Sequence, residues 1–181
     1  DLHIDAQRDL DDLLGVGSEE GCWRQIPVIE LPNSKGTPIG KKKGVLFISY
    51  NMLITRLDQI VEWLGRDLDG GEGAWNGCLL FDEAHRAKNL VPDSGTKPTK
   101  TGVAVHAIQA RLPNARVVYC SATAVSEPRN YAYMERLGLW GPGSPFDDGL
   151  GRAAAEYDDG AADDGGRERV LGLDIDAVDG D

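Results

Sequence analysis

The sequence is poor in cysteine and has no long apolar run. Only three of its 181 residues are cysteines, and Cys22, Cys78 and Cys120 are far apart in the chain. Such scattered thiols exclude a disulfide framework and paired-cysteine zinc sites, and they are typical of a reducing, intracellular compartment. No apolar stretch reaches the ~18–20 residues of a membrane-spanning helix, and no basic-then-apolar leader opens the chain. We therefore expect an intracellular protein with no membrane partner.

Acidic charge is concentrated at the end of the chain. The whole sequence carries a net charge of −11. Residues 147–181 hold 12 acidic residues against three arginines, a net charge of −9, whereas residues 1–146 contribute only −2. The final segment also lacks a sustained apolar period, which predicts a disordered acidic tail rich in Gly and Asp. The near-neutral body is compatible with nucleic-acid binding, so the net charge does not exclude that function.

Short apolar runs alternate with amphipathic stretches in the body of the chain. The runs predict strands, the last three of them buried on both faces, at residues 22–31, 44–50, 78–81 and 116–120. The stretches predict helices at residues 2–14, 52–64, 101–112 and 128–137. Thr101 is the expected N-cap of the third helix, and Gly138 is expected to end the fourth. Strands that alternate with helices indicate an α/β fold with a parallel sheet flanked by helices.

The strongest local signal lies at residues 79–85, which read Leu-Leu-Phe-Asp-Glu-Ala-His. An apolar strand that ends in two carboxylates brings Asp82 and Glu83 to the carboxyl edge of a parallel sheet, where ligands of open α/β sheets bind. In nucleotide-hydrolysing motors the first carboxylate holds Mg²⁺ and the second orients the attacking water. By itself the motif also fits a pair of acids that merely opens a solvated loop or caps a helix.

A second signal follows the next apolar run, which ends in Ser121, Ala122 and Thr123. Superfamily 2 helicases carry a Ser/Thr-Ala-Thr element after the strand beside the acidic one. Its hydroxyls hydrogen-bond the acidic box and couple nucleotide state to nucleic-acid binding. An ordinary strand exit also contains small hydroxyl residues, but two such elements in this order favour the helicase interpretation.

Longer runs resemble the strawberry notch family, in the part called its AAA or P-loop NTPase domain. The resemblance extends from residue 1 to Phe146 and includes residues 44–50, 55–57, 81–89, 100–102, 133–134 and 136–141. Its most specific run is residues 115–123, followed by residues 126–130. The family reads DECHKAKN where this chain reads DEAHRAKN, a change that leaves the acidic pair intact. The Gly-rich stretch at residues 69–73 and the acidic tail lie outside the resemblance. It implies that residues 1–146 are a partial first RecA-like lobe of a DExH-box motor, and that residues 147–181 are a separate tail.

The resemblance also implies a mechanism for the complete protein, with ATP and Mg²⁺ as cofactors. Asp82 would anchor Mg²⁺ through water, Glu83 would position the attacking water, and His85 would relay to Ser121 and Thr123. The implied role is nuclear transcriptional regulation. The implied partners are chromatin, DNA or another nucleic acid, together with transcription regulators.

Two further groups are candidates for contacts around this site. The first group follows the Ser-Ala-Thr element and either lines the cleft or forms an interdomain contact. It consists of Glu127, Arg129 and Asn130. The basic run Lys41, Lys42 and Lys43 either contacts nucleic-acid phosphates or is a solvated charge run that flanks a buried strand.

No phosphate-binding loop is found in the sequence. Residues 36–42 resemble one superficially, but they have one residue too few between the glycines, and Lys42 replaces the hydroxyl residue that reaches Mg²⁺. They also precede a strand, whereas a phosphate-binding loop follows one. We therefore expect the Walker A segment and the second lobe to lie outside this chain, and the chain alone to be inactive. Two alternatives stay open, namely a non-hydrolysing binding module derived from a helicase lobe and a truncated gene product without independent activity.

Overall fold

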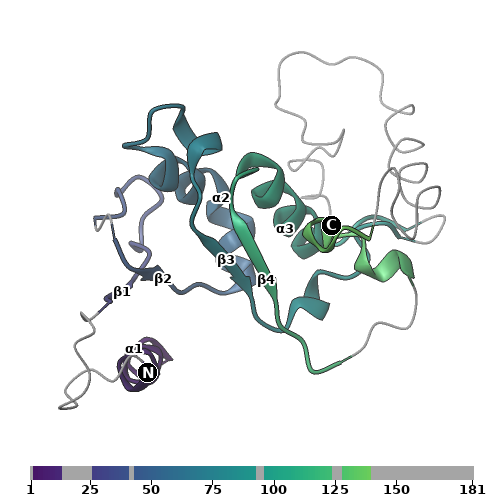
Figure 1. Cartoon of the computed structure of the whole chain (residues 1–181), viewed down its shortest axis with the longest axis horizontal. Coiled ribbons are helices and arrows are strands. Elements are labelled where there is room, and N and C mark those ends of the chain that lie inside the picture. The colour runs from purple at the N-terminus through teal and green to yellow at the C-terminus, as the bar shows by residue number, and fades with distance from the viewer. Residues whose placement is uncertain (1, 14–25, 41–42, 93–95, 124–127, 140–181) are drawn as a thin grey trace. The chain divides into compact units, whose positions relative to one another are not determined.

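The computed structural model describes residues 2–13, 26–40, 43–92, 96–123 and 128–139 (Figure 1). In chain order its helices and strands are α1 (Leu2–Leu13), β1 (Val28–Ile29), β2 (Val45–Leu46), α2 (Tyr50–Gly65), β3 (Cys78–Phe81), α3 (Lys100–Arg111) and β4 (Arg116–Tyr119). Short 3₁₀ turns occur at Gly71–Ala74, Ala84–Ala87, Pro128–Tyr131 and Glu135–Leu137. The chain divides into two compact units, residues 1–63 and 64–181. Within the described ranges, no helix is long and apolar enough to cross a membrane.

In the first unit, α1 is joined to a small parallel sheet. β1 pairs with β2, with Val28 opposite Val45. The Gln7 side chain of α1 donates to Ile26 O at 3.0 Å and accepts from Val28 N at 2.6 Å. These are the backbone groups with which a neighbouring strand would pair, so Gln7 satisfies the free edge of β1.

The prediction of a strand buried on both faces at residues 44–50 is wrong. Only Val45 and Leu46 form a strand there, and Val45 and Phe47 leave 41% and 46% of their surface exposed. A continuous apolar run does not reveal how many faces of a strand are covered. Gly44 is required before this strand, because its φ is +149° and a Cβ would lie 2.4 Å from Pro27 O.

The predicted helix at residues 52–64 is confirmed as α2, which begins two residues earlier and ends one residue later. Arg56 interrupts it with φ −130° and ψ 15°, and its buried guanidinium donates to Asn33 O at 2.7 Å. Gln59 of the same helix donates to Thr37 O at 2.7 Å. Two side chains of α2 therefore hold the loop at residues 33–37.

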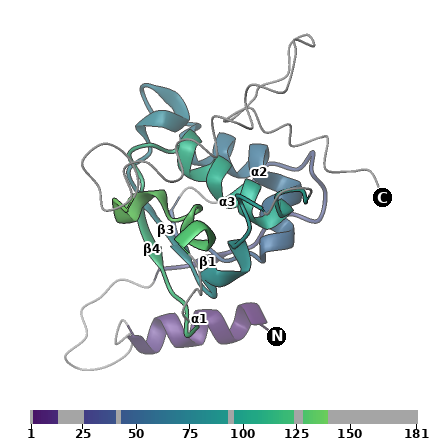
Figure 2. The ribbon, with the colours of Figure 1, turned by 90° about the vertical axis from the view of Figure 1, so that its right-hand side faces the viewer.

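In the second unit, β3 and β4 form a parallel pair. Phe81 lies opposite Tyr119, and their rings stack with centroids 5.8 Å apart. α3 runs along one side of this sheet in both ribbon views (Figures 1 and 2), and the Tyr119 hydroxyl bonds to Gln109 of α3. On the other face Leu80 and Val118 are 63% and 43% exposed. The prediction that these strands are buried on both faces is therefore wrong within this chain.

The α/β class with parallel strands is confirmed, although the described strands lie in two two-stranded sheets and not in one. The predicted N-cap of α3 is wrong: Thr99, not Thr101, caps the helix by accepting from Gly102 N at 3.2 Å. The helix lies one residue earlier than predicted and is buried almost all round between Gly102 and Gln109.

The predicted helix at residues 128–137 is also wrong, because two 3₁₀ turns take its place. Tyr133, between them, is fully buried, and its backbone carbonyl accepts from Gln109 Nε2 at 2.8 Å. This tertiary contact draws the chain into the core and prevents a continuous helix. Gly138 ends the second turn with φ 65°, as the sequence indicates. The predicted tail, and the part of the first predicted strand before Ile26, lie outside the described residues.

Candidate functional site

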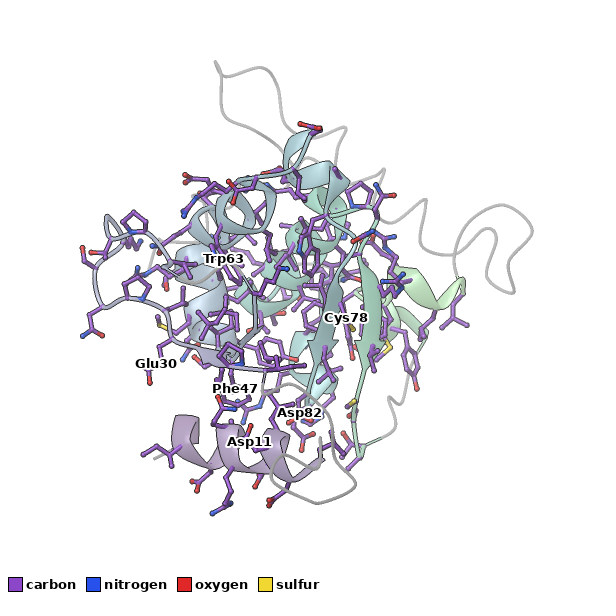
Figure 3. All side chains as sticks on the ribbon, turned by 60° about the vertical axis from the view of Figure 1, so that its left-hand side comes forward. Asp11, Glu30, Phe47, Trp63, Cys78 and Asp82 are labelled. Carbon is purple, nitrogen blue, oxygen red and sulfur yellow. The ribbon has the colours of Figure 1, made fainter. Side chains whose placement is uncertain are left out.

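Asp82 lies directly beyond the carboxyl end of β3 (Figure 3), and Glu83 follows it in the chain. Asp82 and Glu83 are both exposed, and Asp82 Oδ1 accepts from the Glu83 backbone N–H at 3.0 Å. Glu83 has φ 49° and ψ 46°, a left-handed conformation that costs a non-glycine residue about 1 kcal/mol or more. This turn ends the strand and starts the 3₁₀ turn Ala84–Ala87, which leaves both carboxylates at the edge of the sheet.

The backbone brings together the segment that follows β3, residues 82–89, and the Ser-Ala-Thr segment that follows β4. Residues 82–89 are called the acidic segment below. β3 and β4 are parallel neighbours, so both chains leave the sheet at the same edge. Cys120 N donates to Phe81 O at 2.9 Å, and Ala84 N donates to Cys120 O at 2.8 Å. The parallel pairing thus continues past the last residues of the two strands and aligns the segments that follow.

His85 joins the two segments through its side chain. Its Nδ1 lies 3.0 Å from Ser121 Oγ and 3.2 Å from Glu83 Oε2. Both partners face the same ring nitrogen, so the tautomer that carries Nδ1–H fits both contacts. His85 therefore contacts both the serine hydroxyl and the second carboxylate of the acidic pair, and the relay through these groups stays a prediction.

The Ser-Ala-Thr segment forms a compact hydroxyl turn. Ser121 Oγ donates to Thr123 O at 3.2 Å and accepts from Thr123 N at 3.4 Å, and the two hydroxyl oxygens are 3.4 Å apart. Ala122 contributes no polar side-chain atom between them. All three residues are exposed, so the two hydroxyls and the His85 ring form one polar surface beside the carboxylates.

The donor set at this edge suits a magnesium nucleotide. Carboxylate oxygens are the protein ligands that Mg²⁺ prefers, and this ion usually keeps several waters and takes substrate phosphates as further ligands. Among the described residues, no group of three or more His, Cys, Asp or Glu side chains forms an all-protein metal site. Two exposed carboxylates fit Mg²⁺ better than a metal with a closed protein shell.

The remaining predicted contact residues are only partly described. Asn130 is half-buried in the turn Pro128–Tyr131, which also contains the backbone of Arg129, and Glu127 lies outside the described residues. Lys43 is exposed in the first unit, and Lys41 and Lys42 are outside the described part of the chain. The structure thus brings His85, Glu83 and Ser121 into contact. The roles of the lysine run and of the residues after the Ser-Ala-Thr element stay predictions.

Sequence reasoning missed the side chains that hold the segment after the Ser-Ala-Thr element. Arg136 donates to Gln109 O at 2.9 Å and to Pro113 O at 2.6 Å, so it satisfies carbonyls at the end of α3. Burial raises the pKa of Tyr119, and the neighbouring Arg136 opposes that rise. No motif in the sequence signals these contacts.

Comparisons with known proteins identify relatives of this chain. Residues 1–160 match the protein family described as P-loop containing NTP hydrolase pore-1. The chain is 50% identical over 157 residues to Protein FORGETTER 1 of Arabidopsis thaliana, an alignment that covers 82% of the chain and 11% of that protein. It is 45% identical over 157 residues to Protein strawberry notch homolog 1 of Homo sapiens, with 81% of the chain and 11% of that protein covered. The chain therefore spans about a tenth of the length of these curated relatives. No solved structure matches it.

Proposed function

This chain belongs to the family of P-loop containing NTP hydrolases that includes the strawberry notch proteins, and we propose that it carries the metal-binding and water-activating part of an ATP-dependent, helicase-like motor. The observation that carries the proposal is the contact of His85 with both Glu83 and Ser121 at the carboxyl edge of β3 and β4. Residues 1–146 would belong to the first RecA-like lobe, and residues 147–181 would form an acidic tail.

The roles of the residues follow from their places in this contact. Asp82 would hold Mg²⁺ through water, and when bound the ion would neutralise charge on the phosphates of ATP. Glu83 would accept a hydrogen bond from the attacking water and orient it. His85 would report the state of Glu83 to Ser121 and, through the hydroxyl turn, to Thr123, while the small Ala122 keeps that turn compact. The site would thus couple hydrolysis to the segment that follows β4.

Nucleic acid is the proposed partner of the motor. The family supports a helicase-like interaction in general, and we infer chromatin or DNA, with transcription regulators, as the specific partners in the nucleus. Lys41, Lys42 and Lys43 would contact phosphates. The residues that follow the hydroxyl turn would line the cleft or contact a second lobe; they are Glu127, Arg129 and Asn130.

The test is a charge-neutral substitution of the second carboxylate in the complete protein that contains this chain. Glu83→Gln keeps the shape of the side chain and the Asp82 carboxylate, so ATP binding should stay within about twofold of wild type. Turnover should fall by about 10²–10³-fold, because the group that orients water is lost. Glu62→Gln, at an exposed position of α2, is the matched control and should leave both quantities unchanged. Unchanged turnover in Glu83→Gln would contradict the proposal and favour a non-hydrolysing binding module.

A further inference from the structure

Thr99, which lies outside the acidic segment, holds the end of that segment in place. Its hydroxyl donates to Lys88 O at 2.8 Å and accepts from Gly102 N at 3.2 Å. Its own backbone N–H donates to Asn89 O at 3.1 Å. One residue therefore caps α3 and also binds the two consecutive carbonyls with which the acidic segment ends.

The contact between α3 and the acidic segment is closer than most residues would allow. A Cβ on Gly102 would lie 2.9 Å from Ala87 O and 3.2 Å from Leu90 Cα. Backbone atoms cannot give way as the end of a flexible side chain can. The first turn of α3 thus packs directly against the backbone of residues 87–90. Thr99 makes its hydrogen bonds to Lys88 O and Asn89 O within this contact.

The same segment is fixed independently at its other end. Cys120 N donates to Phe81 O, and Ala84 N donates to Cys120 O, so the β4 backbone holds the chain where it leaves β3. Residues 82–88 are therefore held by β4 at one end and by Thr99 at the other. Ala84 and Ala87 are 0% and 1% exposed, so the turn between these two anchors rests its methyl groups on the core and turns its polar side chains outward.

We propose that Thr99 is a positioning residue for the acidic site, an inference that rests on the proposed function. Its bond to Lys88 O fixes the turn on which His85 stands, and so sets the 3.0 Å approach of His85 to Ser121 and the orientation of Glu83. Without the bond, the end of the turn is free to move away from α3. Displacements of about 1 Å in a catalytic arrangement cost up to about 10²-fold in rate.

Three substitutions at Thr99 separate this role from simple helix capping. Thr99→Ser keeps the hydroxyl and therefore both bonds. Thr99→Asp keeps an acceptor for Gly102 N, as good N-caps do, but has no proton to donate to Lys88 O. Thr99→Val loses both bonds at nearly constant shape. Thr101→Val, two residues further along in the same helical turn, is the matched control.

The first measurement is steady-state Mg-ATP turnover in the complete protein, with the melting temperature of each variant. Positioning predicts that Thr99→Asp and Thr99→Val lower kcat about tenfold or more while KM changes less than about threefold, and that Thr99→Ser restores wild-type kcat. Only Thr99→Val should lower the melting temperature clearly. A wild-type kcat in Thr99→Asp would mean that Thr99 only caps α3, and would overturn the inference.

The second measurement is NMR of the histidine side chains in the 181-residue chain, and it does not depend on activity. The chain contains three histidines, so imidazole NMR signals can be assigned by single His→Gln substitutions. Thr99→Asp should shift the signals of His85 and leave those of His106 in place. If Glu83→Gln leaves turnover unchanged, the proposed function fails, and the His85 signal alone decides whether Thr99 positions this ring. If Glu83→Gln abolishes turnover while Thr99→Asp changes neither kcat nor the His85 signal, the positioning inference is wrong and the proposed function stands.

Discussion

Mild acid should destabilise the second unit through one buried histidine. His106 lies on α3, is 3% exposed, and contacts the Glu135 carboxylate through Nδ1. Burial lowers the pKa of His106 from 6.5 to about 4, because the charged imidazolium loses its hydration. The contact joins α3 to the turn Glu135–Leu137, so it helps to hold the segment that follows the hydroxyl turn.

The direction and size of the effect follow from this shift. The unfolded chain binds a proton at His106 below about pH 6.5, whereas the folded chain does so only below about pH 4. Stability is therefore lost as the pH falls through this window, and a shift of this size corresponds to about 3 kcal/mol. Above pH 6.5 the ring is neutral in both states, and its contribution does not change with pH.

The assay is urea unfolding of the full chain, followed by tryptophan fluorescence, from pH 7.5 to pH 4. Carboxylates also titrate in this range, so the informative quantity is the difference from His106→Gln, which keeps a neutral donor for Glu135 but cannot be protonated. The wild type should lose about 3 kcal/mol more than this variant between pH 6.5 and pH 4. Parallel pH dependence of the two proteins would show that protonation of His106 does not destabilise the fold.

Three other perturbations have definite expected outcomes. A Gly→Ala substitution inside a helix usually stabilises the protein by up to about 1 kcal/mol. Gly102→Ala should instead lower the unfolding free energy in urea by about 1–3 kcal/mol, because the new Cβ meets Ala87 O. Gly73→Ala is the control and should be neutral, because a Cβ there has open space. Deleting residues 147–181 should change the unfolding free energy by less than about 0.5 kcal/mol, because this acidic stretch has little apolar surface to bury; strong amide-exchange protection across residues 150–175 would contradict this. The purified 181-residue chain should show no Mg-ATP turnover, because its sequence contains no Gly-x-x-x-x-Gly-Lys-Ser/Thr loop to hold the phosphates; turnover that Glu83→Gln abolishes would show that another segment binds them.

The sequence was informative where a local pattern alone decides the structure. The apolar runs before Asp82 and Ser121 predict β3 and β4 almost to the residue. The resemblance to the strawberry notch family implies that His85 relays to Ser121, and the structure places their side chains in contact at the edge where β3 and β4 both end. The positions of the two segments at one sheet edge could thus be predicted from the sequence, whereas the chemistry of the site stays a prediction.

Features that depend on distant contacts were not predictable in the same way. The turn at residues 128–137 has helical spacing, but the buried Tyr133 and its bond to Gln109 outweigh that preference. Thr99 and Thr101 are equally good caps in sequence, and only the carbonyls of the acidic segment distinguish them. An apolar run likewise cannot show whether one face or two faces are covered, which is why the exposure of Leu80 was missed.

A structure of the complete protein with Mg²⁺ and a non-hydrolysable ATP analogue would show whether Asp82 and Glu83 hold the metal and the attacking water. We expect the metal beside Asp82, connected to its carboxylate through a water molecule. We also expect a second water held by Glu83 and facing the γ-phosphate, with His85 still in contact with Ser121. A nucleotide whose phosphates and metal lie away from the carboxyl ends of β3 and β4 would contradict these expectations.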